Sequence, residues 1–275
     1  MPELLSLAAT VARLGDAAKY FDLDVVEECA STNTELLARA ERAAPSGTAL
    51  AALRQTAGRG RRGREWISAP GDSLAFSLLW RFAPGTAPVG LSLAVGVAVV
   101  DALAKVSPGG HVGVPPGPEV SPGGTAPTQL KWPNDVLRGG RKLGGILVEL
   151  LPGATHAAVI GIGINLRLPE AMPGELRAAA AALDDDTDPN ALLAALLIEL
   201  RTVLERFAAS GFAALRDDWV RLHAYQDAPV VLLSDFGPRR EGVCRGVDAD
   251  GALLFESGGR IERILSGEIS LRPLA

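Results

Sequence analysis

The sequence predicts an α+β main domain that is followed by a small β-barrel. Apolar residues recur at a spacing near 3.6 in several segments, and strand-like segments are interleaved with them. From Pro229 to Ala275 the pattern changes to short strands separated by turns, and the DADG sequence at 248–251 is a hairpin signal. We therefore divide the chain into an N-terminal extension (1–20), a main domain (21–226) and a C-terminal domain (227–275).

Helices and strands alternate in the first half of the chain. Residues 1–20 suffice for one short helix. Another helix is expected to begin near Ser31, because Thr32 and Glu35 have the spacing of a capping box. The other elements predicted here are strands over 24–29, 48–53 and 74–80 and a long apolar helix over 89–106.

Residues 107–129 differ from their surroundings. They are rich in Pro and Gly and have almost no apolar pattern, so they cannot bury enough surface to offset their ordering entropy. We expect a mobile surface insertion without a role of its own. Beyond it, strand-rich segments over 130–168 precede a helical region over 192–225, which is expected to break at Ser210–Gly211.

The composition argues against several classes of function. A net charge of -5 disfavours a general nucleic-acid binder, because binding to phosphates needs a basic surface. Cys29 and Cys244 lie far apart and His111, His156 and His223 form no cluster, so we expect neither a disulfide framework nor a zinc site. The N-terminus lacks a basic leader, and the most hydrophobic stretch contains charges. We therefore expect a cytoplasmic protein without a membrane span.

The segment most suggestive of chemistry is GRGRRGREW, at Gly58–Trp66. Glycine lets the backbone turn toward a ligand, and arginine offers fixed, bidentate donors to phosphate or carboxylate. Arginines this close repel one another, so we expect a loop that is loosely held until an anion orders it. Trp66 then offers a flat face to a base. The alternative, a solvated basic loop, is less consistent with four arginines so close together: Arg59, Arg61, Arg62 and Arg64.

A second motif, KWPNDV, begins at Lys131. Pro133 restricts its own backbone and that of Trp132, and Asn134 and Asp135 favour a turn. We expect Lys131 at a rigid strand end, where its ammonium can neutralise a carboxylate attacking a phosphate. Asn134 or Asp135 could hold Mg²⁺ together with substrate phosphates, although the metal ligands stay unknown.

Three weaker features could complete a binding site. Ser31–Asn33 lies at a helix start, where hydroxyls and N–H groups can bind a polar head group, with simple capping as the alternative. The Gly144–Gly145 pair permits close approach by a backbone or ligand. In GIGIN, at Gly161–Asn165, alternate glycines leave room for a flat ligand, and Asn165 could contact an adenine edge.

These motifs favour chemistry by positioning and charge stabilisation. The sequence offers no assembled Ser–His–Asp or Cys–His set and no GxxxxGK[ST] phosphate loop. Adenylate formation needs neither, because an ionised carboxylate attacks the α-phosphate of ATP while the enzyme neutralises the developing charge.

The motifs STN, GRGRRGREW, KWPND, KLGGILVE, GIGIN and GEISLR occur in the order found in biotin–protein ligases, which the chain resembles from Ser31 to Arg272. The resemblance implies a catalytic domain similar to class II aminoacyl-tRNA synthetases and a C-terminal SH3-like barrel. It implies the synthesis of biotinyl-5′-adenylate from biotin and MgATP, and transfer of biotin to a lysine of a biotin carboxyl carrier protein or domain.

The resemblance also assigns residues. Lys131, Arg59 and Arg61 become the catalytic candidates, with Lys131 at the biotin carboxylate and Arg59–Arg61 in a loop that closes over the adenylate. Glu268 and Arg272 match a region implicated in ATP use and carrier docking. The expected biotin-binding residues are Ser31, Thr32, Asn33, Gln55, Arg59, Gly60, Arg61, Lys131, Gly144 and Gly145. Those expected to bind ATP or the adenylate are Arg59, Arg61, Arg62, Arg64, Trp66, Lys131, Asn134, Asn165 and Arg272.

Three other functions remain to be tested. A lipoate–protein ligase would share the fold and the adenylate chemistry but differ in its acyl pocket. A DNA-binding biotin sensor would need a winged-helix segment, which residues 1–20 are too short to encode, so we expect the monofunctional type without DNA binding. A binding module with a decayed site is disfavoured by Lys131 and the arginine loop. The expected oligomeric state is a monomer or a weak dimer.

Overall fold

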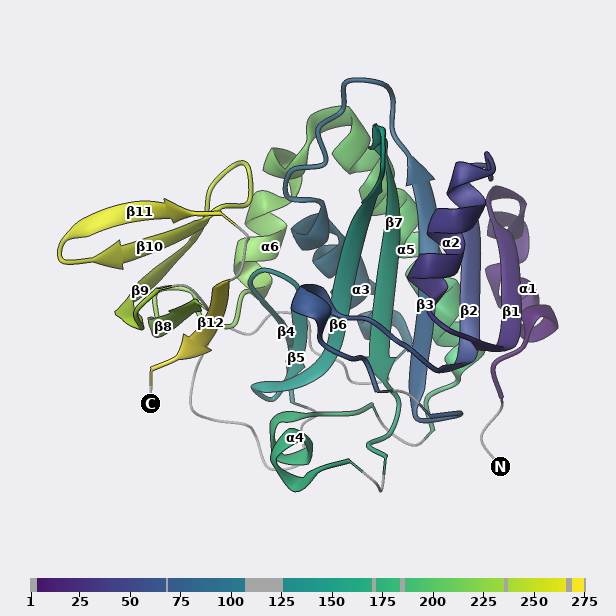
Figure 1. Ribbon diagram of the computed structural model, residues 1–275, viewed down its shortest axis with the longest axis horizontal. Helices are drawn as coiled ribbons and strands as arrows, with labels where there is room; N and C mark the ends of the chain where they lie inside the picture. The colour runs from purple at the N-terminus through teal and green to yellow at the C-terminus, as the bar shows by residue number, and fades with distance from the viewer. Residues whose placement is uncertain are drawn as a thin grey trace.

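The computed structural model describes residues 4–67, 69–106, 126–169, 172–183, 186–234, 237–265 and 269–274. A mixed seven-stranded sheet forms the centre of the main domain, and a smaller sheet lies beside it (Figure 1). The order of the large sheet is β1-β2-β3-β7-β6-β5-β4, in which only β1 and β2 run parallel. Its strands are β1 Asp22–Cys29, β2 Thr48–Gln55, β3 Ser73–Arg81, β4 Thr128–Lys131, β5 Asp135–Arg138, β6 Arg141–Leu151 and β7 Ala154–Asn165.

Helices cover both faces of the large sheet, which is why its central strands are apolar on both sides. Helices α3 (Leu91–Val106) and α5 (Pro189–Ser210) pack against each other on one face, and α2 (Thr32–Glu41) packs on the other (Figure 1). The main core lies between the sheet and the α3–α5 pair. The remaining helices are α1 Leu7–Leu14, α4 Gly174–Ala179 and α6 Arg216–Leu222, with 3₁₀ turns at Gly15–Tyr20, Arg61–Gly63 and Phe212–Leu215.

The C-terminal sheet has the order β11-β10-β9-β8-β12, with antiparallel pairing throughout. The predicted DADG turn joins β9 to β10, and Gly251 N donates to Asp248 O at 3.0 Å. This sheet agrees with the small β-domain expected from the sequence. Its strands are β8 Pro229–Ser234, β9 Arg240–Val247, β10 Leu253–Ser257, β11 Arg260–Ile264 and β12 Ile269–Pro273.

Two expectations about element ends need correction. The N-cap of α2 is Ser31 and not Thr32, and Ser31 makes no side-chain capping bond. The Thr32 hydroxyl instead faces Gln55 and Ser77, so it serves a tertiary contact. The insertion over 107–129 ends earlier than expected, because its last two residues already pair in β4; residues 107–125 lie outside the described part of the chain. The Trp132–Pro133 peptide bond is cis.

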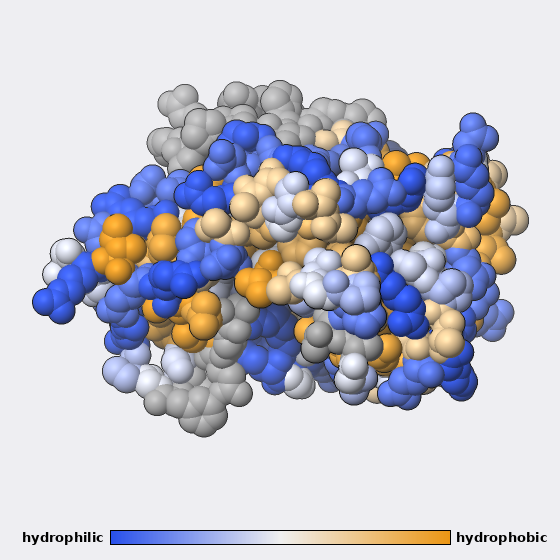
Figure 2. Space-filling view, turned by 90° about the horizontal axis from the view of Figure 1, so that it is seen from above, coloured by the Kyte–Doolittle hydropathy of each residue, from blue (hydrophilic) through white to orange (hydrophobic). Residues whose placement is uncertain are grey.

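Across the described residues, none of the helices is long and apolar enough to cross a bilayer. Exposed hydrophobic residues form small groups separated by hydrophilic ones on the face shown in Figure 2. Scattered exposed apolar residues of this kind are normal on a protein surface.

Buried contacts join the C-terminal sheet to the main domain. The Trp132 indole Nε1 donates to Gly251 O at 3.1 Å, and Arg216 Nε donates to Val247 O at 2.8 Å. At the same junction His223 is buried and stacks on Trp219, with ring centroids 4.4 Å apart. The two sheets therefore share a continuous apolar core.

We predict that His223 makes this junction sensitive to acid. Burial lowers the pKa of His223 to about 3, whereas an unfolded histidine titrates near 6.5. The folded protein thus favours neutral histidine, so stability is complete above about pH 6.5 and declines as the pH falls toward 3. Relative to His223→Phe, the wild type should lose about 2 to 3 kcal/mol of unfolding free energy by pH 4.5. Denaturant unfolding of both proteins above pH 6.5 and at pH 4.5 measures this loss. An equal change in unfolding free energy for wild type and His223→Phe would contradict it.

Candidate active site

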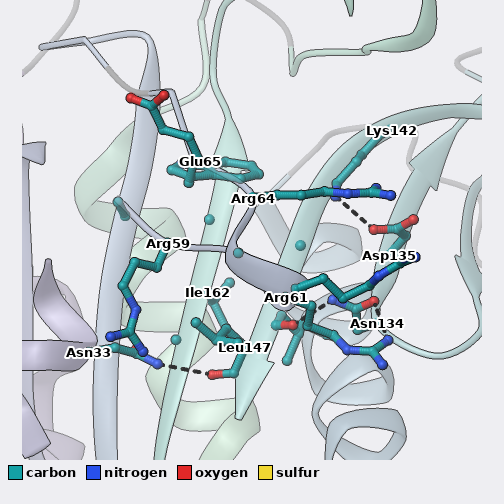
Figure 3. Close-up of a pocket in the computed structure, with 18 of the residues that line it drawn as sticks. Asn33, Arg59, Arg61, Arg64, Glu65, Asn134, Asp135, Lys142, Leu147 and Ile162 are labelled. Carbon is teal, nitrogen blue, oxygen red and sulfur yellow. Dashed lines mark hydrogen bonds and ion pairs between the residues drawn. The ribbon is translucent and has the colours of Figure 1, made fainter. Parts of the chain in front are cut away.

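A cleft lies over strands β3, β7 and β6 of the large sheet, between the start of α2, the arginine loop and the turn after β4 (Figure 3). Its empty volume is about 970 Å³, open solvent at the mouth included, which suits a small-molecule ligand. The last strand of the small sheet contributes Ile269 and Ser270 to its wall. Most residues expected in the site line this cleft: Ser31, Thr32, Asn33, Gln55, Arg59, Gly60, Arg61, Arg62, Arg64, Trp66, Lys131, Asn134 and Gly145.

Polar groups gather where α2 begins. Thr32 N donates to Gln55 Oε1 at 2.8 Å, which ties the helix start to the end of β2. Asn33 Nδ2 donates to Leu147 O at 3.3 Å and to Glu149 Oε2 at 2.9 Å on β6. Because Ser31, Thr32 and Asn33 are all buried, this end of the cleft offers fixed hydrogen-bonding groups in an otherwise apolar setting. Such groups set the orientation of a ligand.

Two lysines share one carboxylate on the opposite side. Lys131 Nζ lies 2.6 Å from Asp135 Oδ2, and Lys142 Nζ lies 2.8 Å from Asp135 Oδ1 (Figure 3). The Lys131 side chain is 8% exposed and that of Lys142 is 43% exposed. Burial lowers the pKa of Lys131 against the opposing effect of Asp135. The trio leaves one net positive charge at the cleft, held in place by Asp135.

Asp135 should contribute stability that disappears in strong acid. Burial by itself raises its pKa, but Lys142 and Lys131 outweigh burial and lower the pKa to about 2. This value lies below the usual 3.9 of an unfolded aspartate. The contribution is therefore complete above about pH 4 and lost as the pH falls through 2. We predict that wild type and Asp135→Asn differ in unfolding free energy at pH 7 and converge between pH 4 and 2. The exposed Asp217→Asn serves as control, and an unchanged difference at pH 2 would refute the prediction.

The arginine loop forms a short hairpin over the cleft. Gly60 N donates to Arg64 O at 2.7 Å, and Trp66 N donates to Gly58 O at 2.9 Å. Arg59 pairs with Glu149, while Arg61 Nη1 donates to Asn134 Oδ1 at 3.3 Å across the cleft. Burial lowers the pKa of Arg61, which is consistent with a partly desolvated guanidinium. The loop is thus attached at both sides of the cleft, and its release on ligand exchange remains a prediction.

The glycines of GIGIN accommodate protein side chains. A Cβ at Gly161 would lie 2.2 Å from Asn33 Oδ1, and one at Gly163 would lie 2.5 Å from Trp66 Cε2. The space expected for a flat ligand is therefore filled by Asn33 and Trp66. Trp66 Nε1 is buried and has no hydrogen-bond partner among the residues that the structure describes. The sequence predicted that small residues are needed at Gly161 and Gly163, but it did not predict that the side chains of Asn33 and Trp66 lie against them.

Three expected site residues do not line the cleft. Gly144 meets the backbone of Gly163, where a Cβ would lie 2.6 Å from its carbonyl oxygen. Asn165 Nδ2 donates to Ala181 O at 2.9 Å and so serves the backbone. Arg272, on β12, is exposed, and its positive charge is near enough to Lys131 to help lower the pKa of that lysine. The role of Gly144 with biotin and those of Asn165 and Arg272 with ATP remain predictions, and Glu268 lies outside the described residues.

Sequence reasoning missed three polar residues near the cleft. Lys142 precedes the Gly144–Gly145 pair, yet only the β5–β6 pairing brings its ammonium to Asp135. Ser77 and Glu149 lie inside strands β3 and β6, where a serine or glutamate carries no local signal of function. The alternation of strand side chains could have placed each on a face of the sheet, but not beside Asn33.

Two protein-family models match the chain. A model of the Biotin/lipoate A/B protein ligase family matches residues 25–165, and a model of the Biotin protein ligase C terminal domain matches residues 232–272. The Bifunctional ligase/repressor BirA of Escherichia coli (strain K12) is 37% identical over 99% of this chain and 80% of its own length. The Biotin--[acetyl-CoA-carboxylase] ligase of Mycobacterium tuberculosis is 34% identical over 93% of this chain and 91% of its own.

Solved structures agree with these matches. The Aquifex aeolicus biotin protein ligase in complex with biotin and ATP has a TM-score of 0.74 and 31% identity, covering 92% of this chain and 99% of that one. A Leishmania major biotin protein ligase in complex with biotinyl-5-AMP, at 20% identity and a TM-score of 0.56, supports the fold. From its cleft, its two sheets and these matches, we conclude that the chain belongs to the biotin/lipoate A/B protein ligase family.

Proposed function

We propose that this chain is an ATP-dependent biotin–protein ligase that makes biotinyl-5′-adenylate and passes biotin to a lysine of a carrier protein. The observation that carries the proposal is one cleft with a buried polar end, a charged end at Lys131 and Lys142, and an arginine loop above both. Relatives named as biotin ligases, and a relative solved with biotin and ATP, support it. The C-terminal domain match favours biotin over lipoate.

The geometry suggests a division of labour. The polar end at Thr32 and Gln55 holds the head group of biotin, so its carboxylate points toward Lys131 and Lys142. These ammonium groups neutralise the carboxylate and the α-phosphate as they approach, which lowers the barrier to adenylate formation and release of pyrophosphate. The lysine amine of the carrier then attacks the acyl carbon of the adenylate, forming an amide and releasing AMP. The arginine loop holds the adenylate between the two steps.

Mg²⁺ enters as part of the ATP substrate in this proposal. Among the described residues there is no group of three His, Cys, Asp or Glu side chains that could hold a metal ion. Asp135 already accepts from two ammonium groups. The cleft thus suits a metal carried mainly by phosphates and water, which is the usual coordination of Mg²⁺ with nucleotides.

The partner we propose is a biotin carboxyl carrier protein or domain of a carboxylase, the substrate class named for the Mycobacterium and Paracoccus relatives. We further propose a cytoplasmic monomer or weak dimer that does not bind DNA. The net charge of -5 supports the last point. Some relatives are named ligase/repressor, so DNA binding by this chain needs its own test. Retention of the chain on operator-like DNA at physiological salt would contradict the proposal.

The decisive experiment is labelling of a purified carrier domain. We expect biotin transfer that requires biotin, ATP and the acceptor lysine, together with stoichiometric pyrophosphate release. A carrier with Lys→Arg at the acceptor site is the matched control. Substituting lipoate tests the rival ligase: turnover with lipoate alone would overturn the proposal, and absence of adenylate with either acid would do so as well.

A further inference from the structure

A chain of hydrogen bonds runs behind the polar end of the cleft, from Thr32 to Glu149. Ser77 Oγ lies 2.7 Å from Thr32 Oγ1 and 2.6 Å from Asn33 Oδ1. Asn33 Nδ2 donates to Glu149 Oε2 at 2.9 Å. Ser77 is completely buried, and neither Ser77 nor Glu149 is among the residues that line the cleft. Ser77 therefore acts on the cleft through Thr32 and Asn33, and Glu149 acts on it through Asn33 and through its ion pair with Arg59.

The direction of each bond follows from its acceptor. A carboxylate only accepts hydrogen bonds, so Glu149 holds Asn33 with Nδ2 toward itself and Oδ1 toward Ser77. An amide oxygen also only accepts, so the hydroxyl proton of Ser77 goes to Asn33. Because a hydroxyl has one proton, Ser77 Oγ must then accept the proton of the Thr32 hydroxyl.

Thr32 is thereby left as an acceptor toward the cleft. Its Oγ1 also lies 3.2 Å from Gln55 Oε1, which already accepts from Thr32 N. The Thr32 and Ser77 hydroxyls have two protons for three oxygen–oxygen contacts. The two shortest contacts, Ser77–Asn33 and Thr32–Ser77, take these protons, and the Thr32–Gln55 contact receives none. The oxygens of Thr32 and Gln55 thus face each other without a proton between them. A ligand N–H directed at this pair would relieve their repulsion.

We propose that Ser77 and Glu149 are positioning residues that set ligand specificity by holding Thr32 as a hydrogen-bond acceptor. This end of the cleft then selects a ligand with an N–H donor. The ureido group of biotin carries two such donors, whereas the dithiolane ring of lipoate carries none. The inference rests on the proposed function and deepens it, because it names two residues outside the cleft lining that hold Thr32 as an acceptor.

The test measures biotin binding to the full chain without ATP, by calorimetry, for wild type and Ser77→Ala. Loss of the Ser77 acceptor frees the Thr32 proton, so biotin affinity should fall about tenfold, the effect of one hydrogen bond. Two biotin derivatives, each methylated on one ureido nitrogen, are measured alongside. For the isomer that lacks the N–H facing Thr32, Ser77→Ala should change affinity less than about twofold.

Ser73→Ala is the matched control. Ser73 lies on the same strand, is also buried, and its hydroxyl has no hydrogen-bond partner among the described residues. Its substitution should leave biotin affinity unchanged. If Ser77→Ala melts below the assay temperature, Glu149→Gln decides, because glutamine can donate as well as accept, which leaves only the longer bond to Leu147 O to orient Asn33. It should show the same dependence on the ureido N–H.

The outcomes separate the two proposals. A wild-type chain that does not bind biotin would overturn the proposed function itself. A wild type that binds biotin while the folded variant binds within about twofold of it would overturn the role of Ser77 and Glu149 alone. Equal loss for biotin and both methylated isomers would also overturn it, because released Arg59 or a collapsed pocket would weaken all three ligands alike.

Discussion

Lys131→Ala should lower the rate of adenylate formation by about two to three orders of magnitude. The Lys131 ammonium is nearly buried and is fixed 2.6 Å from Asp135, so it needs no reorganisation as negative charge develops beside it. Removal of one preorganised charge contact of this kind typically costs 10²–10³ in rate. Pyrophosphate release in the presence of biotin and ATP, without carrier, measures this step directly.

Lys105→Ala provides the control for Lys131→Ala. Lys105 lies on α3, is 61% exposed and pairs with Glu199 outside the cleft. Its loss should leave the rate within about twofold of wild type, since exposed ion pairs contribute little. Lys131→Met keeps the buried aliphatic volume and separates lost charge from lost packing. A rate within tenfold of wild type for a folded Lys131→Met protein would remove Lys131 from the chemistry.

Arg61→Gly should release the adenylate before transfer. Arg61 connects the loop to Asn134 across the cleft (Figure 3), and we propose that its half-buried guanidinium contacts a phosphate of the adenylate. A hydrogen bond to a charged group contributes about 1.5–3 kcal/mol, so dissociation of the adenylate should accelerate by about 10- to 150-fold. Free adenylate then biotinylates lysines of bystander proteins. Labelling of serum albumin added to the reaction reports this leakage.

Arg61→Lys tests geometry against charge, because an ammonium keeps the charge but loses the planar fork. We expect albumin labelling by Arg61→Lys to lie between that of the wild type and that of Arg61→Gly. Arg54→Ala, on β2 and paired with Glu28 away from the cleft, should not leak. Strict carrier labelling by Arg61→Gly would show that the loop does not retain the intermediate through this residue.

Most of the fold could be predicted from the sequence because its signals are local. The apolar helix over 89–106, the break at Ser210–Gly211 and the DADG hairpin all follow from periodicity or turn chemistry, and each is present. The two-part organisation followed from a change of pattern near Pro229. Element ends were less certain, since Ser31 and Thr32 are both good caps and only the contact with Gln55 separates them.

The candidate site was predictable only where a motif carried several chemical groups together. The arginine loop and KWPND met that condition. Lys142 did not, because its approach to Asp135 depends on how β5 pairs with β6. Asn165 shows a different limit of sequence reasoning. Its position at the end of a strand was predicted, but its side-chain amide bonds to Ala181 O and does not face the cleft. The register shift in the β5–β6 hairpin decided the case of Lys142, and contact with the segment after β7 decided that of Asn165.

The final strand has a consequence for the thermodynamics of the molecule. Through Ile269 and Ser270, β12 forms part of the cleft wall while it pairs with β8 in the small sheet. A ligand that touches this wall binds only when the small sheet is docked, so occupancy and docking are linked by mass action. Saturation with the reaction intermediate should consequently slow amide exchange in β8 and β12.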